Sequence, residues 1–201
     1  MGGKCPQLSL PHDDEGEGTT VNYTTPSGFR DVLADEAARR EEAAFDVQQL
    51  LSRNGYVPVE TPTLEIMDVM NAGGRVPGTP FKLFDSRGDL LALRPDVTLQ
   101  IARMCATRLA GQPGPFRFRY QERVFREAEG RPQAEAREMT QVGVELIGEA
   151  GPAADAEVIA LLAESLERVG VGNFRISVAT VGVLRALLAG SGADEAWKAG
   201  V

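Results

Sequence analysis

The sequence predicts an α+β fold in which an antiparallel sheet is flanked by helices. Segments 35–56 and 152–170 carry apolar residues at helical spacing, whereas segments 116–126 and 138–147 alternate apolar and polar residues as strands do. No G-x-G-x-x-G or G-x-x-x-x-G-K-[ST] loop is present, which excludes a Rossmann or P-loop enzyme. Interleaved hairpins and long helices are typical of a sheet with helices on one face.

The composition is that of a globular protein with an excess of acidic residues. Of the 201 residues, 43% are hydrophobic and 25% are charged, enough apolar material for one domain or at most two. The 21 basic residues are outnumbered by 29 acidic ones, so the formal net charge is −8. Since nucleic-acid binding draws affinity from a basic excess, tRNA is not an expected partner. Short apolar runs and the lack of a secretory signal predict a cytoplasmic protein without a membrane span.

The cysteine and histidine content excludes several kinds of site. Cys5 and Cys105 are far apart and form no C-x-x-C unit, which argues against a zinc cluster and a disulfide framework. The single histidine, His12, lies in a polar stretch, so imidazole catalysis and histidine-based metal sites are not expected. We therefore expect no metal and no cofactor, and any chemistry must use carboxylates, arginines, amides and hydroxyls.

The N-terminal quarter predicts an arm followed by a helix. Residues 1–25 alternate glycines with acidic residues and show no apolar periodicity, which predicts a disordered arm, with one domain over 26–201. An amphipathic helix starts close to Asp35, a candidate cap, and ends at Gly55. Its expected apolar face consists of Phe45, Val47, Leu50 and Leu51.

The middle of the chain predicts short elements. Pro58 favours an edge position or the end of a strand, because proline donates no hydrogen bond to a neighbouring strand. Two apolar runs separated by the turn 86–89 predict a hairpin. The expected elements are a strand over 56–60, a helix over 63–72, a mobile loop over 73–80 and the hairpin over 81–93.

The second half predicts longer elements. Arg94, Pro95 and Asp96 interrupt the chain before a helix, and Pro152 and Gly170 bound a later one. The last dozen residues, rich in glycine, are expected to fray. The expected helices cover 97–109, 152–170 and 183–188, and the expected strands cover 116–126, 138–147 and 174–179.

The strand 138–147 carries the most informative pattern. Its period of two places Gln141, Gly143 and Glu145 on one face and the valines between them on the other. Two polar side chains around a glycine predict a floor with an open centre, where Glu145 accepts a hydrogen bond from a cation and Gln141 donates or accepts. A solvated polar face would show the same spacing, and the residues alone leave both interpretations open.

Three further residues are candidates for the same site. Arg126 ends the preceding strand, from where a guanidinium could hold a carboxylate or a phosphate. Asp96 and Thr98 lie at a strand-to-helix junction. A surface arginine explains Arg126 equally well, and Asp96 and Thr98 taken alone would be interpreted as a helix N-cap.

Several blocks, in the same order, resemble the core of the class II histidyl-tRNA synthetases. The matching blocks are TPSGFRD (25–31), RPDVT (94–98), VFRE (124–127) and QVGVE (141–145). The amino-acid sequence of segments 91–103 and 141–148 is more similar still to a non-aminoacylating paralogue of the synthetase, the regulatory subunit of ATP phosphoribosyltransferase in histidine biosynthesis. The resemblance covers residues 24–189.

The resemblance implies a class II synthetase-like core, truncated at the C-terminus, with residues 26–201 as its incomplete N-terminal part and a dimer interface near 26–65. It also implies a histidine-like pocket with no catalytic residue. Asp96 and Thr98 match residues that hold the ligand's α-amino group, and Gln141 and Glu145 match other pocket residues. Arg126 matches the arginine of the second class II motif, which contacts the α-phosphate of ATP or the ligand carboxylate.

The chain departs from the synthetase pattern in two places. The loop GRPQAEARE (130–138) does not reproduce the synthetase's arginine-rich loop, and the third motif and the anticodon domain would lie beyond Val201. The resemblance therefore implies a non-catalytic regulatory subunit that works with the short-form catalytic ATP phosphoribosyltransferase and helps to transmit feedback by L-histidine, as a homodimer or hetero-oligomer. Two alternatives stay open: a fragment of a histidyl-tRNA synthetase, and a degenerate core that is only an interaction module.

Overall fold

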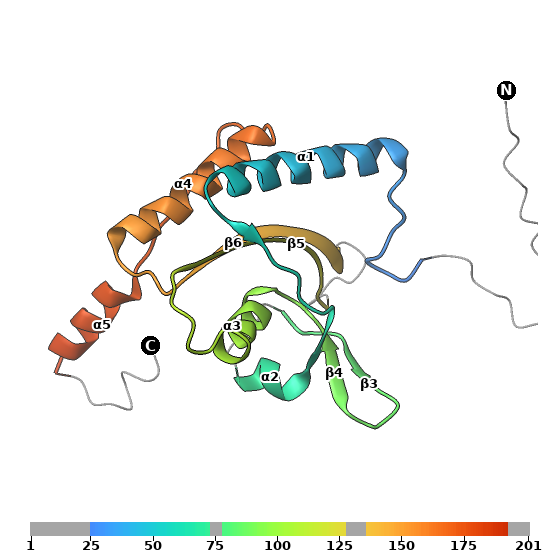
Figure 1. The fold of residues 1–201 in the computed structure, drawn as a ribbon, viewed down its shortest axis with the longest axis horizontal. Coiled ribbons are helices and arrows are strands. Elements are labelled where there is room, and N and C mark those ends of the chain that lie inside the picture. Colours follow the sequence, from blue (N-terminus) through green and yellow to red (C-terminus); the bar gives the residue numbers. More distant parts are fainter. Residues whose placement is uncertain (1–24, 73–77, 128–135, 193–201) are drawn as a thin grey trace, which may run out of the picture.

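The structure is a computed structural model that describes residues 25–72, 78–127 and 136–192. A long strand pair runs through the middle, with two helices above it and a smaller sheet with two helices below it (Figure 1). The helices are α1 (Ala34–Arg53), α2 (Met67–Ala72), α3 (Thr98–Thr107), α4 (Pro152–Arg168) and α5 (Val181–Gly190). The strands are β1 (Val57–Pro58), β2 (Leu64–Ile66), β3 (Lys82–Phe84), β4 (Leu90–Leu93), β5 (Phe116–Phe125) and β6 (Glu138–Ile147).

The strands form two three-stranded sheets. In the larger one, with the order β1-β5-β6, β5 and β6 are antiparallel over all ten residues of each strand. The short β1 joins the outer side of β5 in parallel, so the predicted edge position of Pro58 is confirmed. In the smaller sheet, β4 lies between β2 and β3 and is antiparallel to both, which confirms the predicted hairpin.

The apolar core lies on both faces of the β5–β6 pair. On the lower face, Val97 and Ile101 beside and within α3 pack against three side chains of β5 and are fully buried. On the upper face, Leu50 of α1 and Leu161 of α4 form a second cluster, against which Val142 packs. The valines of β6 therefore lie on the upper face, as the alternation of residues over 138–147 predicted.

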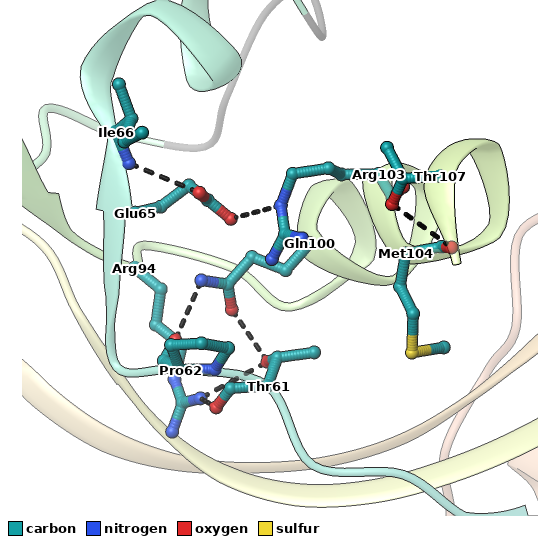
Figure 2. A network of polar contacts seen from close by, with 9 residues as sticks. All are labelled: Thr61, Pro62, Glu65, Ile66, Arg94, Gln100, Arg103, Met104 and Thr107. Carbon is teal, nitrogen blue, oxygen red and sulfur yellow. Dashed lines mark hydrogen bonds and ion pairs between the residues drawn. The ribbon is translucent and has the colours of Figure 1, made fainter.

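Polar contacts lock α3 to the segment before β2. The buried amide of Gln100 accepts a hydrogen bond from the Thr61 hydroxyl at 2.7 Å and donates one to the carbonyl of Pro62 at 2.8 Å (Figure 2). One turn later, Arg103 donates to the carboxylate of Glu65 at 2.7 Å. These contacts fix the position of α3 and of the residues just before it.

Two expectations about α1 are wrong. The N-cap is Leu33, without a side-chain hydrogen bond, and Asp35 lies within the first turn, where its charge complements the helix dipole. Phe45 is 59% exposed, because the buried stripe runs through Ala44, Leu50 and Leu51 and position 45 is rotated about 100° from position 44.

Two other elements differ from prediction. The helix expected over 63–72 begins as the strand β2, because Leu64–Ile66 pair with β4, and only Met67–Ala72 are helical. Residues 174–179 alternate in exposure only over 174–177 and form no strand, since none of the described strands lies beside them to accept their hydrogen bonds. Residues 1–24 of the expected arm (1–25), residues 73–77 of the expected loop (73–80) and residues 193–201 of the expected fraying end lie outside the described residues.

Candidate functional site

Four of the five predicted site residues come together where the start of α3 meets β6. The Thr98 hydroxyl donates to the Glu145 carboxylate at 2.7 Å, and the Thr98 backbone N–H donates to the Asp96 carboxylate at 2.7 Å. The Gln141 amide donates to the other oxygen of Asp96 at 3.2 Å. The residues therefore form one connected cluster, although they span 50 positions of sequence, from 96 to 145.

The packing beneath this cluster explains why it forms. Val97, between the two polar residues of the α3 junction, is fully buried against β5, which turns its neighbours Asp96 and Thr98 toward β6. The junction is held from the other side by Arg94, whose side chain is 3% exposed. Its guanidinium donates to a carboxylate oxygen of Glu122 at 2.5 Å and to the backbone carbonyls of Thr61 and Arg123.

Arg126 lies beside the cluster. Its Nε donates to the carbonyl of Pro95 at 2.9 Å, one residue before Asp96. Its aliphatic chain passes close to Gly78, where a Cβ would lie 3.4 Å from the Arg126 Cδ. In the part of the chain that the structure describes, the guanidinium forms no ion pair with either site carboxylate, so its position suits a ligand oxygen near the start of α3.

The predicted open centre at Gly143 is wrong. Tyr120 stands opposite Gly143 in the strand register, and a Cβ at position 143 would lie 2.5 Å from the Tyr120 hydroxyl oxygen. The glycine therefore makes room for the Tyr120 ring, whose hydroxyl accepts a hydrogen bond from Gln141 at 3.3 Å. The floor of the cluster is aromatic and filled.

The electrostatics of the cluster favour a cation. Burial raises the pKa of the Glu145 carboxyl, the hydrogen bond from Thr98 partly opposes that rise in pKa, and the charge of Asp96 adds to it. The pKa of the Tyr120 hydroxyl is raised by its burial and then by the charges of Glu145 and Asp96. The buried Oε1 of Gln141 has no hydrogen-bond partner among the described residues. Two carboxylates and a free amide oxygen are acceptors for a ligand with an ammonium or other N–H groups.

Tyr120 is the main residue that sequence reasoning missed. It lies in an alternating strand and looks like core, and its role follows only from the register that sets it against Gly143. Arg94 was part of a recognised motif, but its buried pair with Glu122 depends on a contact between distant segments.

The described residues contain no cluster of histidine, cysteine and carboxylate side chains suited to a metal ion. None of the described helices is both long and apolar enough to cross a lipid bilayer.

Three comparisons place the chain among known proteins. Residues 28–200 match the family model described as Histidyl-tRNA synthetase. A protein of Desulfitobacterium hafniense named "ATP phosphoribosyltransferase regulatory subunit" is 40% identical over 180 residues, which cover 90% of this chain and 46% of that protein. A protein of Symbiobacterium thermophilum with the same name is 41% identical over 180 residues, covering 88% and 45%. The chain spans about half the length of these curated relatives.

Solved structures show the same likeness. One is titled as an ATP phosphoribosyltransferase regulatory subunit/histidyl-tRNA synthetase from Bacillus halodurans C; it is 35% identical, with a TM-score of 0.76, over 85% of this chain and 44% of that one. The histidyl-tRNA synthetase from Nostoc sp. PCC 7120 is 25% identical, with a TM-score of 0.70, over 88% of this chain and 39% of that one. The expected fold class, a class II synthetase-like core that is truncated relative to these structures, is confirmed.

Proposed function

The chain belongs to the histidyl-tRNA synthetase family, and from this premise we propose that it is part of a non-catalytic regulatory subunit of ATP phosphoribosyltransferase. The observation that supports this most strongly is the shared name of relatives about 40% identical over most of the chain. In this role it binds L-histidine and associates with the short-form catalytic subunit in the cytoplasm. It thereby contributes to feedback on the first step of histidine biosynthesis.

The polar cluster supports histidine as the ligand. Asp96 offers a carboxylate whose two oxygens are oriented by Thr98 and Gln141, which suits an α-ammonium group. Glu145 is a half-buried carboxylate without a counter-ion among the described residues, so an imidazole N–H or imidazolium would offset the cost of its burial. Arg126, beside Pro95, is placed to take the ligand carboxylate.

Calorimetric titration of L-histidine into the purified chain tests the ligand. We expect saturable binding, weakened at least about ten-fold by Glu145→Gln, because a hydrogen bond to a charged group contributes about 1.5–3 kcal/mol. Glu164→Gln on the exposed side of α4 is the matched control and should bind as the unaltered chain does. Equal affinity in the two variants would place histidine elsewhere.

A mixing experiment tests the partner. Adding the chain, or the full-length protein that contains it, to a short-form catalytic ATP phosphoribosyltransferase should give co-elution and a higher rate that histidine lowers. A coupling free energy of about 1–3 kcal/mol corresponds to roughly 5–150-fold between the histidine site and the partner's active site. A full-length protein that neither binds nor activates the catalytic subunit would contradict the proposed regulatory role.

A histidyl-tRNA synthetase fragment is the second candidate function. Arg126 beside Asp96 favours it, because that position matches the arginine of the second class II motif. Histidine-dependent exchange of pyrophosphate into ATP would show adenylate formation and favour this candidate. If neither exchange nor histidine binding is observed, the remaining interpretation is an interaction module.

A further inference from the structure

A second polar site lies on the opposite face of the strand pair. A cavity of about 440 Å³ is enclosed by the segment before α1, by α1 itself and by the ends of β5 and β6. Arg123 and Thr140, which face each other in the strand register, line it, whereas Gln141 belongs to the other face. The cavity is therefore separate from the cluster around Glu145.

Three arginines from three elements surround this cavity. Arg30 comes from the segment before α1, Arg40 from α1 and Arg123 from β5. They pair with two carboxylates, those of Glu36 and Glu138. The wider part of the same hollow adds the carboxylates of Asp31 and Glu41, so the site as a whole carries no positive net charge. An anion would therefore be held by directed hydrogen bonds from the guanidinium groups rather than by net charge.

The arrangement around Glu36 shows that the arginines can hold an anion. One oxygen of its carboxylate accepts hydrogen bonds from both Arg30 and Arg40, the latter at 2.7 Å. The hydrogen bond from Arg30 is the main cause that lowers the pKa of Glu36 to about 2. The three arginine side chains remain 60%, 51% and 71% exposed, and each guanidinium has five N–H donors, so they can bind a further acceptor.

We infer that this cavity binds a phosphorylated small molecule, with its phosphate oxygens between Arg30, Arg40 and Arg123. A phosphate presents acceptor oxygens in three directions and can therefore contact arginines from three elements. A carboxylate has only two oxygens, and the carboxylate of Glu36 already binds Arg30 and Arg40. The volume lies within the range of small-molecule sites. Phe29 and Val32 supply apolar surface for the body of the ligand, and Glu138 can accept from its hydroxyl or amino groups.

Calorimetric titrations with inorganic pyrophosphate and with ATP, at constant ionic strength, test the site. Both ligands should bind, and Arg40→Gln should weaken each by about ten-fold or more, since one charge-assisted contact is lost. Arg39→Gln, next to it in α1 but outside the cavity lining, is the matched control and should leave affinity unchanged. Glu36→Gln should strengthen binding, because it removes the carboxylate that occupies Arg30 and Arg40.

The two ligands distinguish which part of the cavity is used. Tighter binding of ATP than of pyrophosphate is expected if the body contacts Phe29 and Val32, and Val32→Ala should then weaken ATP more than pyrophosphate. Absence of binding, or affinities that are the same in the Arg40 and Arg39 variants, would overturn the inference. Histidine binding does not involve these residues, so failure here would leave the proposed function intact.

Discussion

Glu145 is a half-buried carboxylate that is held close to Asp96 on the face of β6 that α3 covers. Burial raises its pKa above the usual value of 4.5, so the folded protein holds the proton more firmly than the unfolded chain does. The contribution to stability is then fully present at low pH and is lost as the pH rises from about 4.5 to the folded pKa. Above that pH range, the buried charge of Glu145 lowers the free energy of unfolding of the ligand-free chain.

Replacing Glu145 with glutamine should therefore stabilise the ligand-free chain at neutral pH. The glutamine oxygen can still accept from Thr98, while no charge is buried. Urea unfolding at pH 4 and pH 7 checks this: the free energy of unfolding of the variant minus that of the unaltered chain should increase between the two values. A difference that stays constant or falls would mean that Glu145 is not held above its usual pKa.

Gly143 shows how one residue shapes the floor of the cluster. An alanine there would place a Cβ 2.6 Å from the Cζ of Tyr120, a clash that the rigid ring can relieve only by leaving its present position. We expect Gly143→Ala to lower the free energy of unfolding by about 1–3 kcal/mol, as overpacking does. Gly172→Ala is the control, because nothing lies within 4 Å of its Cβ position.

At the scale of elements, the junction before α3 depends on the buried pair Arg94–Glu122. The arginine also donates to the backbone carbonyls of Thr61 and Arg123, which ties three segments together. The pair therefore fixes the entry of α3 and, through it, the positions of Asp96 and Thr98.

A double-mutant cycle tests this pair. Arg94→Met should destabilise the chain by about 3–5 kcal/mol, because it leaves the largely buried Glu122 carboxylate without an opposite charge. Adding Glu122→Gln removes the buried charge and should recover part of that loss. Chemical denaturation of the four proteins gives the coupling energy, and strictly additive effects would show that the two side chains do not interact.

The long elements could be predicted because local pattern determines them. α4 begins at Pro152, with Gly170 in a left-handed conformation just after its end, and β5 and β6 keep their alternation over ten residues. Short elements are decided by partners instead. Leu64–Ile66 became a strand because β4 lies beside them, and 174–179 did not, because no described strand does.

At the scale of the whole molecule, the site is made by packing between distant segments. The sequence predicted the four residues of the cluster and the face of β6 on which Gln141 and Glu145 lie. The contact between Thr98 and Glu145, however, exists only because α3 lies against β5. The filled centre at Gly143 was not predictable from β6, since the filling side chain, Tyr120, belongs to the other strand. Register and docking therefore carry the information that local spacing lacks.

The outer edge of β6 has no neighbouring strand within the residues described. A ten-residue unpaired edge exposes backbone donors and acceptors, so we expect the purified chain to self-associate as its concentration rises. Sedimentation velocity over a hundred-fold concentration range measures this. Thr140→Lys on the edge strand should reduce association, while Gln121→Lys, exposed on the same face of the inner strand, should not.

The pairing of β1 with β5 has a consequence for the order of folding. Val57 pairs with Phe118, about sixty residues further along the chain. Phe125 at the end of β5 pairs with Glu138 at the start of β6, and only about a dozen residues lie between them. The entropic cost of closing a loop rises with the length of the loop. The β5–β6 pair is therefore expected to form in the transition state and α1 with β1 to dock afterwards. Val124→Ala should then mainly slow refolding, and Leu50→Ala should mainly accelerate unfolding.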